Sequence, residues 1–402
     1  MRVHFDTREI YFLTQFLPLA RALRKRGAEC TFVAYENRPT QRDGIRDGFA
    51  AAGIRPRWFE TREDALEFYQ DEEPDWIVFG REYGYTAELA ERTRTAMVHH
   101  GTGAKTTIWS EALSAFDVRF VSGPFYAGRL REQQPSANLQ EVGYAKLDPL
   151  LRPEPEDPIF DVASVGLEPE RPTLLYAPTH SPSSFPKMHD EFPAHFADFN
   201  ILVKPHMLSF FGTRKRAHRR KMERWRAAPN VYVAPISAFD PVPFMRAADL
   251  LISDLSSVSF EFAAANKPVV MCRFAAVHWT RRGPLSYRLK KRVDSSIEEF
   301  LDIGPNVWRY RDLRAAVDDE LAHPERHAAR RAEVTRVRLG PTDGRTSERI
   351  ADYLEEHVDA ARCPDARRRI FGDCIRPEPA ATSREREHSR ACPPRGVHQP
   401  QG

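Results

Sequence analysis

The chain has 402 residues, of which 60 are basic and 57 acidic, so its formal net charge at pH 7 is only +3. This length leaves room for two domains of ordinary size, and the balanced charge, with no array of basic and aromatic residues, gives no indication of nucleic-acid binding. No apolar run approaches the ~20 residues that span a bilayer, the N-terminus lacks a signal-peptide pattern, and five scattered cysteines fit a reducing compartment. We therefore expect a cytoplasmic protein whose only possible membrane contact is peripheral.

The first part of the chain alternates short strands with helices. Val3 to Phe5 is predicted to be a strand, and Phe12, Phe16, Leu19 and Leu23 then recur at helical spacing on one face. Further short apolar runs, ending in polar or glycine-containing turns, lie at 30–35, 76–79, 96–98 and 118–121. Such alternation predicts an α/β fold, in which helices cover both faces of a parallel sheet.

A change of composition to Arg, Pro, Glu and Asp predicts an interdomain linker at 151–172. The strand pattern then restarts, with apolar runs at 173–176, 201–203, 231–233, 250–253 and 269–271. We expect Rossmann-like domains at 1–150 and 173–360 that face a cleft, the second closed by a helix from Ser347 to about Val358. Residues 361–402 hold few large apolar residues and are predicted to be disordered. Ligands of open α/β sheets bind at the carboxyl ends of the strands.

The segment 248–261 is the most informative part of the chain. A buried strand at 250–252 is followed by Ser253, Asp254, Ser256 and Ser257, and a helical pattern then begins. Unpaired N–H groups at such a helix start favour an anion, above all a phosphate, although an ordinary N-cap would account for one serine. Ser257 and Glu261 share a helix face and form a candidate wall of a nucleotide pocket.

Four other segments place polar residues directly after a predicted strand or at a helix start. They are the segment from His99 to Lys105, 176–180 with Thr179 and His180, 204–206 with Lys204 and His206, and 343–349, where Ser347 can cap a helix and contact a phosphate. A histidine in the first of these, beside glycines that allow close backbone approach, can act as a general base. Adjacent histidines usually point to opposite sides, so one of His99 and His100 is expected to face the cleft.

The stretch 214–226 is strongly basic. It is either a solvated helix face or a landing surface for anionic lipid, each basic residue contributing roughly 1 kcal/mol near a charged membrane. Trp225 within it favours the lipid interpretation. A second basic cluster, which includes Arg281, Arg282 and 288–292, suits a polyanionic acceptor or the same membrane surface.

In their order along the chain, these motifs resemble the CDP-glycerol:poly(glycerophosphate) glycerophosphotransferase family of teichoic-acid primases and polymerases. His100-Gly101-Thr102 with Lys105 matches the His-Gly-Thr-Pro-Leu-Lys segment of that family, and the segment from Gly143 to Asp148 resembles its Gly-Tyr-Pro-Arg-Asn-Asp. The segments 176–179, 204–206, 253–257, 282–283, 304–305 and 343–349 follow in order. Gly103, Ala104, the segment 145–147 and Leu255 depart from the pattern, which leaves the transferred alditol open.

The resemblance implies a glycosyltransferase-B-type fold and transfer of an alditol phosphate, with glycerol phosphate first, from a CDP-alditol to an acceptor hydroxyl with release of CMP. The acceptor would be a polyol phosphate or glycan of a cell-wall or capsule polymer, lipid-linked, and the enzyme could sit at the inner face of the membrane. No cofactor is implied, and no Asp/Glu/His cluster has metal-ligand spacing. Primase and polymerase activity remain equally open, as does the oligomeric state.

The resemblance also assigns roles to residues. His100 would be the base, and His206, Ser256 and Ser257 would stabilise the departing diphosphate, with Arg282 as a further cation. Glu261 or Asp254 would either hold the ribose or orient the turn. The remaining expected substrate-binding residues are Gly101, Thr102, Lys105, Thr179, Lys204, Ser253 and Ser347.

Two alternatives stay open from the sequence. One is a nucleotide-sugar enzyme of the same fold, such as a glycosyltransferase or a UDP-N-acetylglucosamine 2-epimerase-like protein, whose late helix also starts beside Gly, Ser and an acid. The other is a non-catalytic nucleotide-binding subunit of a polysaccharide assembly. The presence of both His100 and His206 disfavours the non-catalytic alternative.

Overall fold

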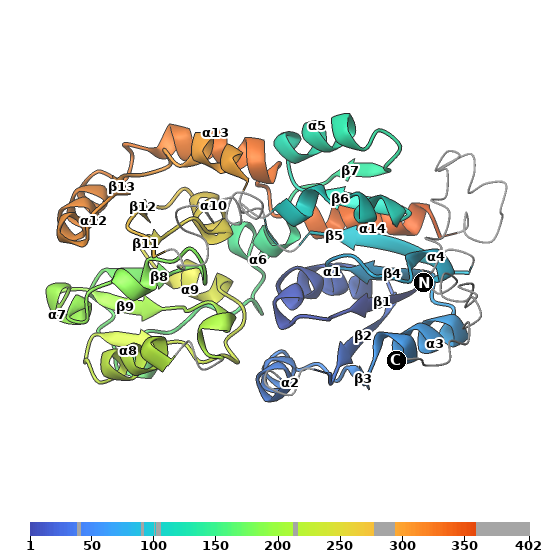
Figure 1. Ribbon diagram of the computed structural model, residues 1–402, viewed down its shortest axis with the longest axis horizontal. Helices are drawn as coiled ribbons and strands as arrows, with labels where there is room; N and C mark the ends of the chain where they lie inside the picture. Colours follow the sequence, from blue (N-terminus) through green and yellow to red (C-terminus); the bar gives the residue numbers. More distant parts are fainter. Residues whose placement is uncertain are drawn as a thin grey trace, which may run out of the picture.

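Two parallel β-sheets form the framework of the protein, each in its own lobe (Figure 1). The computed structural model describes residues 1–37, 42–89, 92–99, 101, 106–211, 216–276 and 294–358. The first sheet has seven strands in the order β3-β2-β1-β4-β5-β6-β7, and the second has six in the order β10-β9-β8-β11-β12-β13. The α/β fold with two Rossmann-like domains is thereby confirmed. The predicted tail, 361–402, lies outside the described residues.

The N-terminal sheet is built from short, mostly buried strands that pair in parallel register. Its strands are β1 (Arg2–Asp6), β2 (Glu29–Tyr35), β3 (Arg57–Phe59), β4 (Trp76–Phe79), β5 (Arg94–Val98), β6 (Val118–Val121) and β7 (Leu139–Glu141). The helices between them are α1 (Leu13–Lys25), α2 (Arg42–Ala51), α3 (Arg62–Glu72), α4 (Thr86–Leu89) and α5 (Pro124–Gln133). Residues such as Phe5 and Val78 are fully buried because helices cover both faces of the sheet.

The second sheet repeats this arrangement. Its strands are β8 (Thr173–Ala177), β9 (Asn200–Val203), β10 (Val231–Val233), β11 (Leu250–Ser253), β12 (Val269–Cys272) and β13 (Asn306–Val307). Its helices are α7 (Phe192–His195), α8 (Arg216–Arg226), α9 (Val242–Ala247), α10 (Ser257–Ala263), α12 (Leu313–Ala322) and α13 (Ala328–Leu339). One apolar cluster lies on each face of the sheet, so β11 contributes Leu251 to one cluster and Ile252 to the other.

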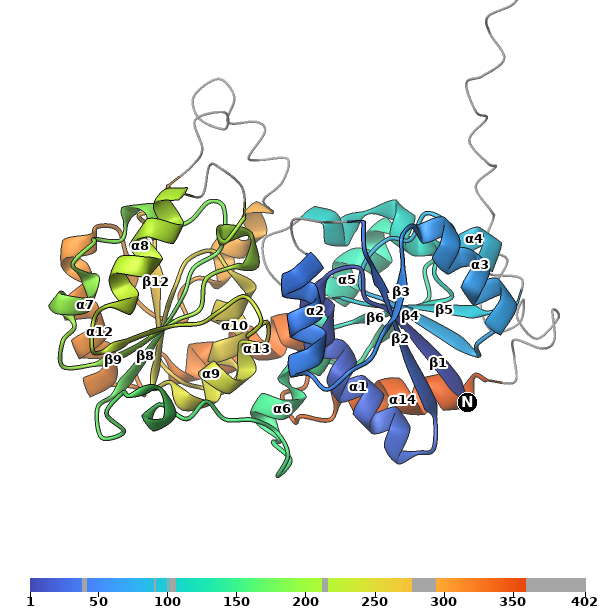
Figure 2. The ribbon, with the colours of Figure 1, turned by 90° about the horizontal axis from the view of Figure 1, so that it is seen from below.

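The last described helix, α14 (Thr346–Glu356), belongs to the N-terminal lobe. Figure 2 shows it beside α1, and its Ile350, Ala351 and Leu354 are buried in the same apolar cluster as Phe16. The indole N–H of Trp76 donates to the carbonyl of Leu354 at 3.0 Å. The expectation that this helix closes the second domain is therefore wrong. Its apolar face is as regular as predicted, but such a face does not specify which sheet it covers.

The connection after α6 (Asp148–Leu151) is held to α1 by ion pairs on its acidic residues. Arg21 pairs with Asp157 at 2.6 Å, and Lys25 pairs with Glu154 at 2.5 Å. On the other side, Phe160 packs against the ring of Phe244 in the second domain, 4.7 Å between centroids. This segment thus contacts both domains, consistent with a linker.

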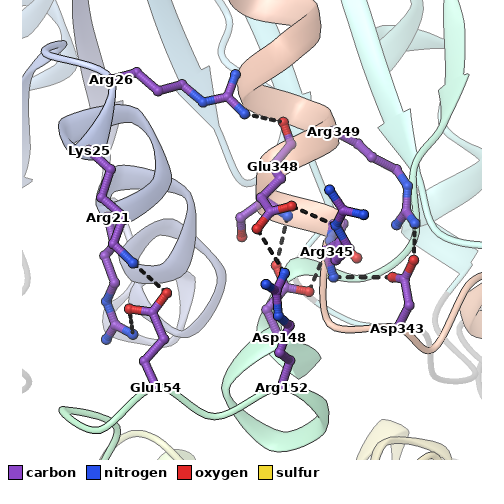
Figure 3. Close-up of polar contacts among 12 residues, drawn as sticks. Arg21, Lys25, Arg26, Asp148, Arg152, Glu154, Asp343, Arg345, Glu348 and Arg349 are labelled. Carbon is purple, nitrogen blue, oxygen red and sulfur yellow. Dashed lines mark hydrogen bonds and ion pairs between the residues drawn. The ribbon is translucent and has the colours of Figure 1, made fainter.

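A network of charged side chains surrounds the start of α14 (Figure 3). Glu348 pairs with Arg345 at 2.7 Å and with Arg152 at 2.9 Å, and Asp343 pairs with Arg349. These side chains are largely exposed, so each pair contributes at most about 1 kcal/mol. Arg26, at the end of α1, donates to the carbonyl of Glu348 at 3.3 Å, so the network joins the linker, α1 and α14.

The basic helix α8 does not present its tryptophan to the surface. Trp225 is only 1% exposed and packs in the second domain, with its indole N–H donating to the carbonyl of Asp190 at 2.8 Å. Lys221 is also buried, and its ammonium donates to the carbonyl of Met188 at 2.5 Å. The interpretation of Trp225 as an interfacial residue is therefore wrong. Within the described part of the chain, no helix has both the length and the apolar character to cross a membrane.

Candidate active site

A cavity of about 340 Å³ lies between the two domains, where the carboxyl ends of both sheets meet. The N-terminal domain contributes Ile10, Tyr11, Thr14, Gly80, Arg81, Glu82, Met97, His99, Gly101, Thr106, Thr107, Ile108 and Leu113. The second domain contributes 177–182, 204–207, Phe210, Ile236, Phe239, Pro241 and 255–258. Lys146, from a turn of 3-10 helix (Ala145–Leu147) after β7, completes the wall. Ligands of parallel sheets bind at this edge.

Gly101 of the N-terminal domain lies close to the second domain. A β-carbon placed on this glycine would lie 3.9 Å from the hydroxyl oxygen of Ser257, across the cavity. Gly101, after β5, and Ser257, at the start of α10, therefore face one shared space. A side chain at position 101 would occupy that space, so glycine keeps it open.

The structure brings some of the predicted residues together and separates others. Gly101, Thr179, Lys204, His206, Ser256 and Ser257 all line the cavity. Ser253, Asp254, Glu261 and Ser347 do not line it. His100, Thr102, Lys105 and Arg282 lie outside the described residues.

His206 sits directly after β9 and caps a short 3-10 helix (Met207–Ser209). Its Nδ1 accepts a hydrogen bond from the backbone N–H of Leu208 at 3.1 Å. A neutral imidazole held in this way carries its proton on Nε2. The ring of His180, which follows β8, lies 4.7 Å from that of His206. His180 lies in the motif at 176–180 but is not among the predicted site residues, because its contact with His206, which follows a different strand, cannot be read from the sequence.

Two lysines meet in the cavity wall. Desolvation, helped by the nearby charge of Lys146 and opposed by Asp240, lowers the pKa of Lys204 to about 8. The ammonium of Lys146 pairs with Glu261 of α10 at 2.6 Å, and both side chains are buried. The bond to Glu261 uses one of the three ammonium hydrogens of Lys146, so both lysines can still donate to a diphosphate. Lys146 was not selected from the sequence, although it lies in the motif 143–148 that carried the resemblance.

Glu261 and Asp254 have structural positions behind the cavity wall. Both are almost fully buried. The carboxylate of Asp254 accepts hydrogen bonds from the backbone N–H groups of Thr179 and Ser184, each at 2.8 Å. Desolvation outweighs these bonds and raises the pKa of Asp254 to about 6. Of the two roles that the sequence left open for Asp254, this geometry fits the orientation of the turn, since the carboxylate is committed to the loop at 179–184.

Ser253 is likewise turned away from the cavity. Its side chain is fully buried, and its hydroxyl donates to the carbonyl of Ala177 at 2.7 Å, which ties β11 to β8. Ser256, in contrast, is half-buried at the cavity wall and caps α10 through the N–H of Val258 at 3.4 Å. The two hydroxyls, three positions apart, therefore have different surroundings.

Ser347 does not meet the cavity at all. The start of α14 is already occupied by the carboxylate of Asp148, which accepts from the N–H groups of Thr346 at 3.1 Å and Ser347 at 2.7 Å. Ser347 is 4% exposed. The expectation that Ser347 contacts a phosphate is wrong, because a protein carboxylate takes the place of the anion.

Of the two adjacent histidines, His99 is described and lines the cavity. Its Nε2 accepts a hydrogen bond from Nε of the buried Arg119 at 3.1 Å. Arg119 also donates to the side chain of Gln134 and to the carbonyl of Ile108, so it fixes both the ring and the wall at 106–109. A nitrogen that accepts from a guanidinium is poorly placed to take a proton from a substrate.

Among the described residues, one group could offer three ligand atoms to a metal ion. It comprises His189, Glu191 and His195, which lie on the surface near α7. None of them lines the cavity.

The two facing parallel-sheet domains, with a cationic cavity between them, define a protein of glycosyltransferase-B architecture. A family model, CDP-Glycerol:Poly(glycerophosphate) glycerophosphotransferase, matches residues 131–356, more than half of the chain. The chain belongs to this family, and the protein is an enzyme of the CDP-glycerol glycerophosphotransferase type. The predicted resemblance is confirmed. No curated protein sequence matches the chain.

Solved structures share the fold at low sequence identity. The wall teichoic acid polymerase TagF is 14% identical, with a TM-score of 0.63 and 89% of each chain covered. A UDP-GlcNAc 2-epimerase from Neisseria meningitidis, bound to UDP-GlcNAc, is 11% identical, with a TM-score of 0.58 over 89% of this chain and all of that one. MnaA of S. aureus, in complex with UDP, is 13% identical, with a TM-score of 0.57 over 89% and 97%.

Proposed function

We propose that this enzyme transfers glycerol phosphate from CDP-glycerol to a hydroxyl group of a teichoic-acid-like surface polymer or its lipid-linked precursor, releasing CMP. The observation that carries the proposal is one shared cavity, lined by Lys146, Lys204 and His206 and also by His99 and Gly101 after β5. TagF, whose fold is similar, has been crystallised with CDPG. The family membership supports the donor class, and the cavity supports where it binds.

The donor diphosphate lies against the second-domain wall. Lys204 and Lys146 neutralise its charge, and Nε2–H of His206 donates to an oxygen of the leaving phosphate. The hydroxyl groups of Ser256, Ser257 and Thr179, in the turns after β11 and β8, donate further hydrogen bonds to the phosphates. Positioned cations and donors of this kind account for most of the rate enhancement in phosphoryl transfer.

The reaction breaks one P–O bond and forms another. The acceptor oxygen attacks the β-phosphorus of CDP-glycerol, forming a new phosphodiester to the glycerol phosphate. The bond between that phosphorus and the bridging oxygen breaks, and the oxygen leaves with CMP. The acceptor proton passes to a base, for which we retain His100, next to the Gly101 that faces Ser257.

The proposal of membrane association depends on the exposed arginines of α8 alone. Arg216, Arg220 and Arg224 of α8 have exposed side chains and form a basic surface independent of Trp225. We propose a cytoplasmic enzyme that contacts anionic lipid through this surface. The test is co-sedimentation of the protein with phosphatidylglycerol vesicles. We expect substitution of the three arginines by glutamine to abolish this co-sedimentation.

The decisive experiment measures nucleotide release from a panel of donors. The full chain is incubated with CDP-glycerol, CDP-ribitol or UDP-N-acetylglucosamine and a glycerol phosphate oligomer, and released CMP or UDP is quantified. We expect CMP from CDP-glycerol. Release of UDP from UDP-N-acetylglucosamine alone, or its epimerisation followed by NMR, would favour the 2-epimerase-like alternative, whose fold is shared. Binding of CDP-glycerol without release would indicate a non-catalytic subunit.

The base is tested separately. His100→Ala should abolish CMP release and leave the affinity for CDP-glycerol unchanged, because a base does not hold the donor. Turnover retained in this variant would exclude His100 from the role.

A further inference from the structure

The two walls of the cavity differ in charge. The second-domain wall and Lys146 carry cations and hydroxyls, whereas the N-terminal wall carries Arg81 and Glu82 in the loop after β4. Among the described residues that line the cavity, Glu82 is the one carboxylate. A carboxylate paired with an arginine has no net positive charge, so this wall suits the donor diphosphate less well than the lysine wall does.

Glu82 is held in place by its neighbours. Its carboxylate accepts from the guanidinium of Arg81 at 2.5 Å. Gly80, just before the pair, passes so close to Phe12 that a β-carbon there would meet the ring at 2.7 Å, which fixes where the loop leaves the sheet. Both side chains remain partly exposed, 33% for Arg81 and 41% for Glu82, so a ligand can reach them.

The protonation state of Glu82 suits binding and not proton transfer. Burial works to raise its pKa, but the hydrogen bond and the charge of Arg81 outweigh this effect and keep the pKa below its ordinary value. An ionised carboxylate only accepts hydrogen bonds, and its lone pairs not used by Arg81 can accept from hydroxyl groups. A polyol offers several of these on adjacent carbons.

The position of the pair in the chain points the same way. The family match covers 131–356, so the loop at 80–82 lies outside it. The parts of the cavity wall assigned to the donor, except the turn at Gly101, lie inside the match. The wall at 80–82 is therefore built by a part of the chain other than the matched part that builds most of the donor wall.

We propose that Arg81 and Glu82 form the acceptor subsite, in which Glu82 accepts hydrogen bonds from the terminal polyol of the acceptor and Arg81 meets the phosphodiester that precedes it. This inference rests on the proposed transfer from CDP-glycerol and adds the residues that select the acceptor. Glu82 positions the attacking end of the acceptor, and the proton goes to the separate base.

The test compares Glu82→Gln with a matched control. Glu73→Gln removes the same charge from an exposed Arg–Glu pair of the same domain, Arg92 with Glu73 at 2.8 Å, which does not line the cavity. CMP release is measured with CDP-glycerol as donor and, as acceptors, a synthetic glycerol phosphate oligomer ending in glycerol, or free glycerol. Thermal unfolding of each variant checks that it is folded.

We expect Glu82→Gln to raise KM for the oligomer about 10- to 100-fold, the loss of one hydrogen bond to a charged group, with KM for CDP-glycerol unchanged. Glu82→Asp should recover part of the loss, and Glu73→Gln should match the wild type. Arg81→Met should raise KM for the oligomer more than KM for free glycerol, because free glycerol has no phosphodiester for Arg81 to bind.

Two results would overturn the assignment while leaving the transferase intact. One is an unchanged KM for both acceptors in Glu82→Gln, and the other is a raised KM for CDP-glycerol alone. If Glu82→Gln does not fold, Glu82→Asp and Arg81→Met give the same comparison. Wild-type enzyme that releases no CMP from CDP-glycerol would defeat the proposed function itself, and the acceptor subsite with it.

Discussion

The starts of α10 and α14 are similar in sequence but differ in their surroundings. Each helix follows a turn that combines an acidic residue with serines or threonine. At α10 the hydroxyls of Ser256 and Ser257 line the cavity. At α14 the N–H groups of Thr346 and Ser347 are taken by the carboxylate of Asp148, and Ser347 is buried. One helix start faces a ligand space, and the other is closed by the protein itself.

The difference teaches that a helix start becomes a candidate anion site only if no protein anion already fills it. The first turn of any helix has N–H groups without partners inside the helix. Asp148 meets that need at α14 from 198 positions away in the chain. At α10 the acidic neighbour, Asp254, turns its carboxylate to Thr179 and Ser184, so it leaves the cavity side to Ser256 and Ser257.

The strongest way to break this comparison is to remove His206, a histidine that lines the same cavity as the start of α10. His206→Ala should lower kcat for CMP release about 10²- to 10³-fold, the typical effect of losing a donor to the developing charge. His323→Ala, at the exposed end of α12, should leave kcat unchanged. Steady-state kinetics with CDP-glycerol measure both. Equal rates in the two variants would show that the phosphate does not lie at this wall.

Serine substitutions sharpen the comparison directly. Ser256→Ala and Ser257→Ala should each raise KM for CDP-glycerol about 10- to 100-fold, and the double variant more, since a hydrogen bond to a charged group contributes about 1.5–3 kcal/mol. Ser347→Ala should leave KM unchanged, because its helix start is occupied by Asp148. Isothermal titration with CDP-glycerol gives the affinities. A larger loss in Ser347→Ala than in the double variant would reverse the assignment.

The sequence was sufficient to predict the two sheets and the edge on which the cavity lies. Apolar runs such as 250–252 and 201–203 are buried strands, and the residues after them must meet at the carboxyl edge. His206, Lys204 and Ser257 were found in this way. Contacts between residues far apart in sequence were not predictable. An apolar pattern shows which face of a helix or strand is buried, but it does not show which element packs against that face.

Three residues illustrate that limit. Trp225 lies in a basic helix and was interpreted as interfacial, yet it packs in the core. Lys146 reaches the cavity only because its turn after β7 lies next to Glu261 of α10. Ile350 covers the first sheet although it follows the second in sequence. Each position depends on which elements meet in three dimensions.

Asp148→Ala tests the closed helix start through stability. Without the carboxylate, the N–H groups of Thr346 and Ser347 lose their acceptor in a buried place, which should lower the free energy of unfolding by about 2 kcal/mol. Asp148→Asn keeps one acceptor oxygen and should lose less. Urea denaturation followed by fluorescence compares both variants with Ser257→Ala, which should be as stable as the wild type. Full stability of Asp148→Ala would mean that the carboxylate does not stabilise α14.

The smallest expected effect, seen only above pH 8, is a pH dependence that belongs to the cavity wall. Desolvation and the charge of Lys146 lower the pKa of Lys204 to about 8, so the side chain is a cation below pH 8 and neutral above it. The kcat/KM for CDP-glycerol, which reports the free enzyme, should therefore fall about tenfold for each pH unit above 8. Lys204→Arg keeps its charge in this range and should extend the plateau. Lys267→Arg is the matched control, because burial also lowers the pKa of Lys267 but its ammonium donates to the carbonyls of Met245 and Ala248, away from the cavity. A wild-type profile that stays flat to pH 10, or one that Lys267→Arg changes as much as Lys204→Arg, would mean that Lys204 is not the cation that meets the donor phosphates.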